Sequence, residues 1–327
     1  MESTGKNADF IRAMLFHLGE NMWSDIPVKE WGPYRTPEEL ADVCAADHVR
    51  CDEALWRCVT ERAAACGTNV LIIDLGEAMV YPSHPELAVR GSWSPEKMRR
   101  ELERLRKLGL EPIPKLNFST SHDTWLKEYG RMVSTPDYYR VCEDVIRDTI
   151  EIFDRPRFFH LGYDEEWPGH QRQYAYMAVR QGALWWHDFL YISGLVEKQG
   201  VRPWVWADYY WKHREDYERF MPRSILQSIA YYDVEFDRSK LKPSARNRLD
   251  SFINLDRAGF EQVPVATNWA HRENVGLLTA FLKRTITSGR LKGQIMAPWF
   301  MTNPKWKKKL LEGIDLFQAA LRENGYV

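Results

Sequence analysis

The chain alternates between short apolar runs and longer amphipathic stretches from one end to the other. A short apolar run between turn residues is typical of a buried strand, and apolar positions three and four residues apart are typical of a helix that covers it. Eight such strand-helix units follow one another. The predicted strands are Ala13–Leu18, Val70–Leu75, Leu110–Leu116, Arg157–Leu161, Arg202–Ala207, Ile225–Ala230, Gln262–Thr267 and Gly293–Ala297.

The stretches between these strands carry helix start and stop signals. Ser94 precedes one helical pattern as a cap and Gly109 ends it, for example. The predicted helices span residues 50–66, 95–108, 136–153, 174–198, 245–255, 274–288 and 306–324. Eight units in this order predict a single (β/α)8 barrel that takes up residues 1–327 as one domain. The alternative is an open doubly wound sheet, which usually has fewer units and a glycine-rich phosphate turn after its first strand. The sequence has no such turn.

Composition narrows the possible partners. The net charge of -1 and the isoelectric point near 6.8 give no general attraction to nucleic acids or anionic membranes. The run Lys307–Lys309 begins an amphipathic helix, and we interpret it as a solvated helix face. Residues 1–10 lack the apolar run of a secretory signal, and no segment is apolar enough for a membrane span. We therefore expect a cytoplasmic protein, unless a signal segment has been removed from it.

The fourth predicted strand ends in the most informative stretch, His160-Leu-Gly-Tyr-Asp164-Glu165-Glu166-Trp167. Neighbouring carboxylates at the end of a buried strand raise one another's pKa, which is one way to make a general acid. The Trp167 indole offers an apolar face on which a sugar ring can stack. Acid and aromatic together indicate carbohydrate chemistry, and the structural alternative is that the two acids cap a helix.

In a (β/α)8 barrel the residues that follow the strands meet at one end and form the site. Carboxylates and amides can bind sugar hydroxyls there, while indoles cover the C–H faces of the ring. The candidate substrate-binding residues are Glu20, Asp74, Asn117, His122, Tyr163, Trp206, Asp208, Tyr231, Tyr232, Trp269 and Trp299.

Many sugar-cleaving barrels pair the acid of the fourth strand with a nucleophilic carboxylate after the seventh. Here the seventh strand ends Thr267-Asn268-Trp269, and the nearest acid is Glu273, inside the next predicted helix. The two-carboxylate retaining mechanism is therefore poorly supported. Two routes remain: inversion with Asp208 or another acid of the ring as base, or assistance from a group on the substrate itself.

The stretch from His160 to Glu165 is similar to the His-x-Gly-Gly-Asp-Glu signature of the family 20 glycoside hydrolases, the β-N-acetylhexosaminidases. The resemblance implies a barrel in which Asp164 orients the acetamido group of the substrate, so that its carbonyl oxygen attacks the anomeric carbon. It implies that Glu165 protonates the leaving oxygen. The segments Gly109–Asn117 and Trp206–Asp208 also resemble the third and fifth strands of that family.

The chain departs from the family pattern at several positions. Tyr163 replaces the second glycine of the signature, Lys115 and Asn117 stand where the family has acids, and His122 lies one position later than the family's histidine. An arginine that grips the substrate is missing near Glu20. These departures indicate a diverged relative with an altered sugar preference, or with no hydrolytic activity.

The predicted function is thus a glycoside hydrolase that cleaves β-linked glycosides, of N-acetylhexosamines as the resemblance implies, with carbohydrate as its partner and without a cofactor. One alternative is an inverting or otherwise retaining glycosidase of plain sugars. A second is a non-catalytic sugar-binding barrel. A third is a divalent-metal sugar isomerase or amidohydrolase, although the sequence shows no recognisable ligand spacing, and we expect no metal.

Overall fold

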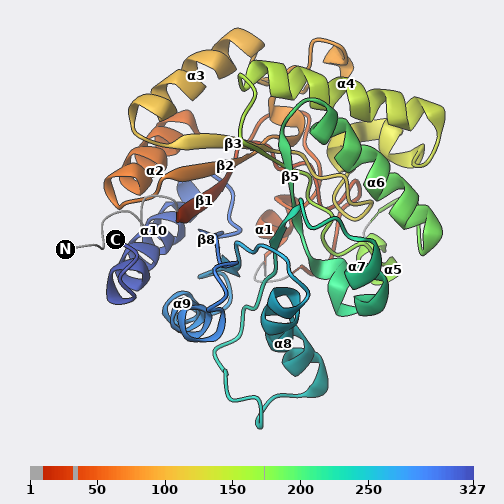
Figure 1. Cartoon of the computed structure of the whole chain (residues 1–327). Coiled ribbons are helices and arrows are strands. Elements are labelled where there is room, and N and C mark those ends of the chain that lie inside the picture. The colour runs from red at the N-terminus through yellow and green to blue at the C-terminus, as the bar shows by residue number, and fades with distance from the viewer. Residues whose placement is uncertain (1–9, 32–35, 173) are drawn as a thin grey trace.

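The computed structural model describes residues 10–31, 36–172 and 174–327, and its centre is a sheet of eight parallel strands (Figure 1). The strands lie in the order β6-β5-β4-β3-β2-β1-β8-β7. Their bounds are β1 Ile11–His17, β2 Val70–Asp74, β3 Glu111–Lys115, β4 Phe158–His160, β5 Arg202–Trp206, β6 Leu226–Ser228, β7 Val265–Ala266 and β8 Gly293–Met296.

The first and last strands of this order meet and close the sheet. The amide of Gln227 donates to the carbonyl of Glu261 at 3.0 Å, and the amide of Val263 donates to the carbonyl of Gln227 at 2.8 Å. A further backbone bond joins Val265 to Ile229 at 3.0 Å. The predicted (β/α)8 barrel is confirmed, and the open doubly wound sheet is wrong because this edge is paired.

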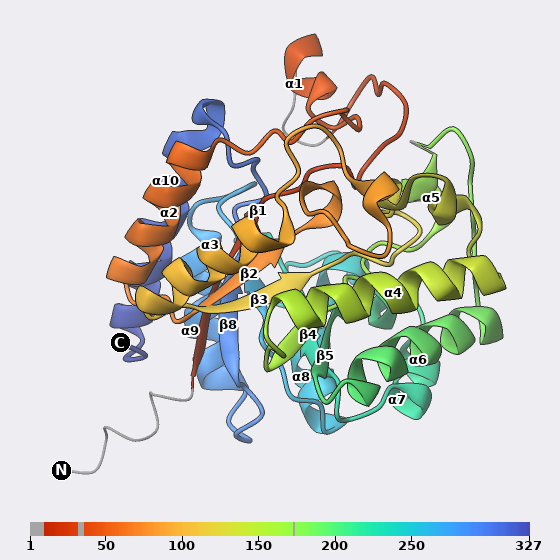
Figure 2. The same ribbon diagram turned by 90° about the horizontal axis from the view of Figure 1, so that it is seen from above.

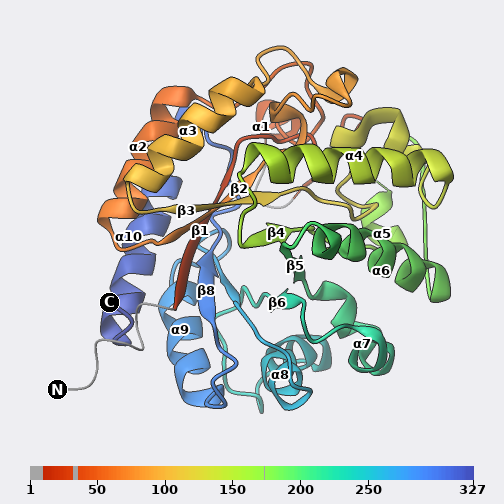
Figure 3. The same cartoon turned by 45° about the horizontal axis from the view of Figure 1, so that its top comes forward.

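Helices surround the strands on all sides (Figure 3). Their bounds are α1 Pro37–Ala41, α2 Glu53–Ala65, α3 Pro95–Lys107, α4 Pro136–Ile152, α5 Pro168–Gln171, α6 Ala183–Lys198, α7 Arg214–Phe220, α8 Pro243–Arg257, α9 Asn274–Thr285 and α10 Lys307–Glu323. The expected caps are present. The Ser94 hydroxyl accepts from the amide of Lys97 at the start of α3, and Thr135 does the same for Tyr138 at the start of α4.

Alternate residues of each strand divide the apolar core into two layers. In β1, Ala13 and Leu15 point into the barrel, whereas Met14 and Phe16 pack against the helices outside it. This division follows from the two-residue period of a strand. The inner layer is filled by side chains, so the functional surface lies at the strand ends.

The structure differs from the predicted helix 174–198 at its beginning. Helix α6 starts only at Ala183, because Gly182 has a φ of 57° and the residues before it form a long loop after β4. In Figure 2 this loop, α5 and α1 gather at one end of the barrel. The Tyr174 hydroxyl donates to the carbonyl of Met22 at 2.5 Å, which ties the loop after β4 to the loop after β1.

No helix within the described part of the chain combines the length and the apolar character that a bilayer crossing needs. Most of the N-terminal stretch that the signal-peptide argument used, residues 1–9, lies outside the described residues.

Candidate active site

The backbone after β4 makes a strained turn that presents the acids. Gly162, Tyr163 and Glu165 have φ values of 72°, 73° and 52°, and such positive values are unfavourable for side chains other than glycine. A Cβ on Gly162 would lie 2.0 Å from the Asn117 side-chain oxygen, so only glycine fits there. That oxygen accepts from the amides of Ser119 and Tyr163, at 3.0 and 3.2 Å. Asn117 thereby holds the turn against the end of β3.

Asp164 and Glu165 point to the solvent-accessible side of this turn, with 20% and 35% of their side chains exposed. The Asn117 amide donates to Asp164 Oδ1 at 2.7 Å. The Nε2 atom of His122 lies 3.2 Å from Asp164 Oδ2 and 3.3 Å from Glu165 Oε2. His170 of α5 reaches the same Glu165 oxygen with its Nδ1 at 3.0 Å. The structure therefore places three polar side chains, Asn117, His122 and His170, around the two acids.

The two imidazoles set the charge of Glu165. Burial alone would raise its pKa, but the ion pairs with His122 and His170 outweigh burial and lower it. Burial would lower the pKa of His122, but the charges of Asp164 and Glu165 outweigh burial and raise it. The two shifts together favour a protonated His122 beside an ionised Glu165. The protons of such a cluster belong to the group as a whole.

Asp208, the first residue after β5 and Ala207, is buried close to the same acids. Burial raises its pKa well above the ordinary value, and the charges of Asp164 and Glu165 raise it further. A carboxyl group in this environment holds its proton more tightly than an exposed one. Asp208 is thus a further titratable group beside Asp164 and Glu165.

Aromatic side chains form a wall beside the acids. The ring of Trp206 lies 5.7 Å from that of Trp299, and the ring of Tyr232 lies 6.5 Å from Trp299 and 6.4 Å from Trp269. Trp299 also has a positive φ of 60°. Tyr232, Trp269 and Trp299 are half-buried, so parts of these rings remain accessible to a ligand.

Two predicted binding residues do not join this wall. The ring of Tyr163 is 1% exposed and packs edge-on against Trp185 and Phe189 of α6. The Tyr231 hydroxyl donates to the carbonyl of Glu235, and its ring contacts Phe236 on the outside of the barrel. Both rings belong to the layer between strands and helices, where a ligand at the strand ends does not reach them. The backbone turn after β4 gives Tyr163 this direction.

Buried charges occupy the ends of β1, β2 and β3. Asp74 contacts Lys115 at 2.6 Å and His17 at 3.2 Å. Burial would raise the pKa of Asp74, but these partners lower it. Glu20 is buried, and burial raises its pKa to about 7 although His17 lowers it in part. Its carboxylate oxygens accept no hydrogen bond from the described residues. Asp74 is therefore committed to a structural pair, whereas the Glu20 carboxylate is buried without a hydrogen-bond partner among the described residues.

A buried ion network anchors the loop that carries the acids. Arg180 donates to Glu166 at 2.6 Å, to Asp188 of α6 at 3.0 Å and to the carbonyl of Phe118 at 2.5 Å. Burial would lower the pKa of Arg180, but the Glu166 charge raises it. The sequence placed Arg180 inside a helix, and nothing in its spacing indicated this role. His170 was also missed, and its position five residues after Glu165 was the only signal for it.

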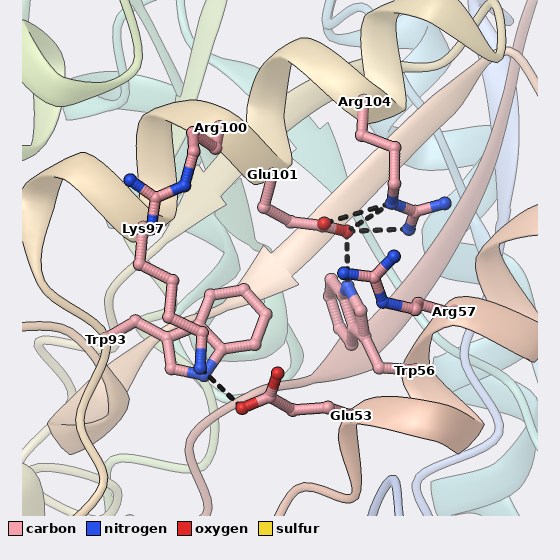
Figure 4. Close-up of a pocket in the computed structure, with 8 residues that line it drawn as sticks. All are labelled: Glu53, Trp56, Arg57, Trp93, Lys97, Arg100, Glu101 and Arg104. Carbon is pink, nitrogen blue, oxygen red and sulfur yellow. Dashed lines mark hydrogen bonds and ion pairs between the residues drawn. The ribbon is translucent and has the colours of Figure 1, made fainter.

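A separate concave region lies between α2 and α3, outside the barrel (Figure 4). Its volume is about 270 Å³. The Trp56 indole donates to Glu101 at 2.7 Å, Arg104 forms a forked pair with the same carboxylate, and Lys97 pairs with Glu53. Its main charges satisfy one another, so we interpret it as part of the helical packing.

Comparison with known proteins supports the fold. No family model and no curated protein sequence matches this chain. Several solved structures are similar to this chain. An exo-β-N-acetylglucosaminidase of family 20 from Vibrio harveyi, solved with N-acetylglucosamine, has a TM-score of 0.61 and 13% identity over 93% of this chain and 54% of its own. A mutant β-hexosaminidase from Streptomyces plicatus, solved with the same product, has a TM-score of 0.62 and 12% identity over 94% and 63%.

Dispersin B is a third neighbour, with a TM-score of 0.57 and 14% identity over 84% of this chain and 95% of its own. The chain thus spans little more than half the length of the Vibrio enzyme but nearly the whole of Dispersin B. At these identities the comparison shows a shared barrel fold, of the type that the resemblance to family 20 implied.

Proposed function

We propose that the protein is a glycoside hydrolase that cleaves β-linked glycosides of N-acetylhexosamines, with the acetamido group of the substrate as nucleophile. The observation that carries the proposal is the pair Asp164 and Glu165 at the accessible end of β4, each held by its own polar partners. The family 20 fold supports it. The residues after β7 support it too, since Asn268 and Trp269 stand where a two-carboxylate enzyme needs a nucleophile.

In the first step, Glu165 gives a proton to the glycosidic oxygen while the acetamido carbonyl oxygen attacks the anomeric carbon. The bond from that carbon to the leaving oxygen breaks with its electron pair, and a cyclic oxazolinium ion forms. Asp164 accepts a hydrogen bond from the acetamido N–H and stabilises the positive charge that develops there. In the second step, Glu165 takes a proton from water as the water opens the ring.

A histidine beside Glu165 can supply the proton that the first step needs. Glu165 is ionised at rest, and the imidazoles of His122 and His170 lie 3.3 and 3.0 Å from its Oε2 atom. As the glycosidic bond breaks, the leaving oxygen gains electron density and becomes more basic, so it takes a proton from Glu165, and the proton of the His122 ring can pass to Glu165 in turn. Trp299 and Tyr232 supply apolar faces for the sugar.

A panel of β-nitrophenyl glycosides tests the proposal, with and without the 2-acetamido group, on wild type and Glu165→Gln in parallel. Release from 2-acetamido substrates alone, lost in the variant, is the expected result. Release from plain glycosides would point to an internal base, with Asp208 the first candidate because of its raised pKa. Absence of nitrophenol release from every glycoside of the panel would favour a non-catalytic sugar-binding barrel.

A further inference from the structure

The acidic centre has a second property, the convergence of its ligand atoms. His122, Asp164 and Glu165 each offer one atom such that all three atoms lie within 4.8 Å of one another. His122 is almost fully buried, and its Nε2 atom is 3.2 and 3.3 Å from the two carboxylate oxygens. Yet neither ring nitrogen is aligned for a hydrogen bond with a described residue. The Nε2 atom thus lies close to both carboxylate oxygens without a hydrogen bond to either.

This geometry fits ligands around one ion. A tetrahedral ion with bonds of about 2.1 Å holds its ligand atoms about 3.4 Å apart. The two separations from His122, 3.2 and 3.3 Å, are close to this value. The two carboxylate oxygens lie within 4.8 Å of each other, so they need to approach by about 1.4 Å at most. A movement of the partly exposed Glu165 side chain achieves it.

Outer contacts orient the two carboxylates, as such contacts do at known metal centres. Asn117 donates to Asp164 Oδ1, which leaves Oδ2 directed at His122. His170 contacts Glu165 Oε2 at 3.0 Å. Asn117 is in turn fixed by the amides of Ser119 and Tyr163. The two carboxylates are therefore held before an ion arrives.

We propose that His122, Asp164 and Glu165 form a binding site for a divalent transition-metal ion of the zinc class. One imidazole and two carboxylates suit Zn²⁺ better than Mg²⁺ or Ca²⁺, which prefer oxygen ligands alone. The two carboxylates balance the charge of the ion. The partial exposure of Asp164 and Glu165 leaves a path for entry and a position for water.

One consequence rests on the proposed function. An ion bound to Glu165 occupies the oxygen that must carry the proton, and an ion bound to Asp164 occupies the oxygen that must meet the acetamido group. Metal binding and hydrolysis therefore exclude each other, and free Zn²⁺ inhibits the enzyme in competition with substrate.

Metal binding is measured first, without substrate. Purified, chelator-treated protein is titrated with Co²⁺, whose visible absorption reports imidazole and carboxylate ligands, and with Zn²⁺ in a calorimeter. We expect one ion per chain. His122→Ala should weaken binding about 100-fold or more, and the isosteric Glu165→Gln at least about tenfold. The control His187→Ala, on the exposed face of α6, should bind as wild type does. Melting curves establish that each variant is folded.

The outcomes separate the two proposals. Absence of Co²⁺ and Zn²⁺ binding, or equal binding by wild type and folded His122→Ala, overturns the metal site. Binding that depends on His122 in a protein without hydrolase activity supports the site and overturns the proposed function. Hydrolysis that persists in chelator and falls on addition of Zn²⁺, but not Mg²⁺, supports both. Hydrolysis that requires Zn²⁺ supports the site and replaces substrate assistance with metal-dependent chemistry.

Discussion

Two regions of this molecule combine tryptophan with charged side chains, and they differ in how the charges are satisfied. Between α2 and α3, Glu101 accepts from Trp56 and Arg104, and the surrounding backbone is regular helix (Figure 4). At the strand ends, Asp164 and Glu165 lie side by side in a turn with positive φ. The indole N–H groups of Trp206 and Trp299 have no partner there among the described residues.

This difference in how the charges are satisfied distinguishes charges that stabilise the fold from charges that serve catalysis. Paired opposite charges on helices add modestly to stability. Like charges side by side on a strained backbone cost free energy and persist only where the surrounding structure enforces them, here through Asn117 and Arg180. Groups left unsatisfied in the free protein are available to a ligand. We therefore expect substitutions in the outer cluster to change stability and substitutions at the strand ends to change catalysis.

The largest effect is expected for Glu165→Gln. The amide keeps the shape of the side chain but has no proton to donate, so kcat should fall by about 100 to 10,000-fold. The loss should be greater for substrates with poor leaving groups than for nitrophenyl glycosides, because these need more help from the acid. Near-wild-type turnover by a folded variant would remove Glu165 from the mechanism.

Asp164→Asn should follow, with a loss in kcat of about 100 to 1,000-fold. The amide retains a hydrogen bond with Asn117 but cannot stabilise the positive charge on the acetamido group. Steady-state rates on a 2-acetamido substrate measure the loss. A normal kcat with a raised KM would mean that Asp164 only binds the sugar.

Trp299→Ala is expected to raise KM about fivefold with little change in kcat, because a lost aromatic contact is worth about 1 kcal/mol. Trp93→Phe provides the contrast, since Trp93 packs edge-on to Trp56 in the outer cluster. It should lower the denaturation midpoint and leave KM unchanged. Equal effects of both variants on KM would contradict the division between the regions.

The pH dependence of kcat/KM should report His122. Its pKa is raised above the ordinary 6.5, so the proton and the ion pair that it forms are present below 6.5 and are lost as pH rises through the raised value. Activity should therefore fall on the alkaline side. The variant His122→Asn cannot supply a proton to Glu165, so the alkaline limb of the profile should move to lower pH. If the alkaline limb of the kcat/KM profile did not move in this variant, the limb would report a titratable group other than His122.

The smallest effect on catalysis is expected for Glu101→Gln. Loss of the charge that Arg104 and the Trp56 indole share should cost about 1 to 3 kcal/mol of unfolding free energy. The value of kcat/KM should stay within about twofold of wild type. Denaturant unfolding measures the first quantity, and the nitrophenyl assay measures the second.

The fold was accessible from the sequence because strand and helix periods alternate without interruption. The prediction for the fifth strand, Arg202–Ala207, ends one residue beyond β5. The predicted β7 strand is longer than the two residues observed, since most of its pairing is by isolated bridges. Trp185 and Trp186 lie within the predicted helix 174–198 and are buried in the core. The single-domain organisation and the cytoplasmic location stay predictions.

The candidate site was accessible only in part. The signature placed Asp164 and Glu165 correctly at the end of the fourth strand. Tyr163 turned outward because the positive φ values after Leu161 break the two-residue period of a strand, which no local pattern announces. His170 lies in the short helix α5 and Arg180 in the loop that follows it, and Arg180 contacts Asp188 of α6 and Phe118 after β3. Such tertiary contacts have no signature in a single sequence.

The most direct test of substrate assistance varies the nucleophile itself. Nitrophenyl β-glycosides whose 2-acetamido group carries none, one, two or three fluorine atoms differ in the electron density of the carbonyl oxygen and little in shape. If that oxygen attacks the anomeric carbon, kcat of the wild type should fall steeply with each fluorine. A value of kcat that does not change across the series would show that another group attacks, and it would contradict the role assigned to Asp164.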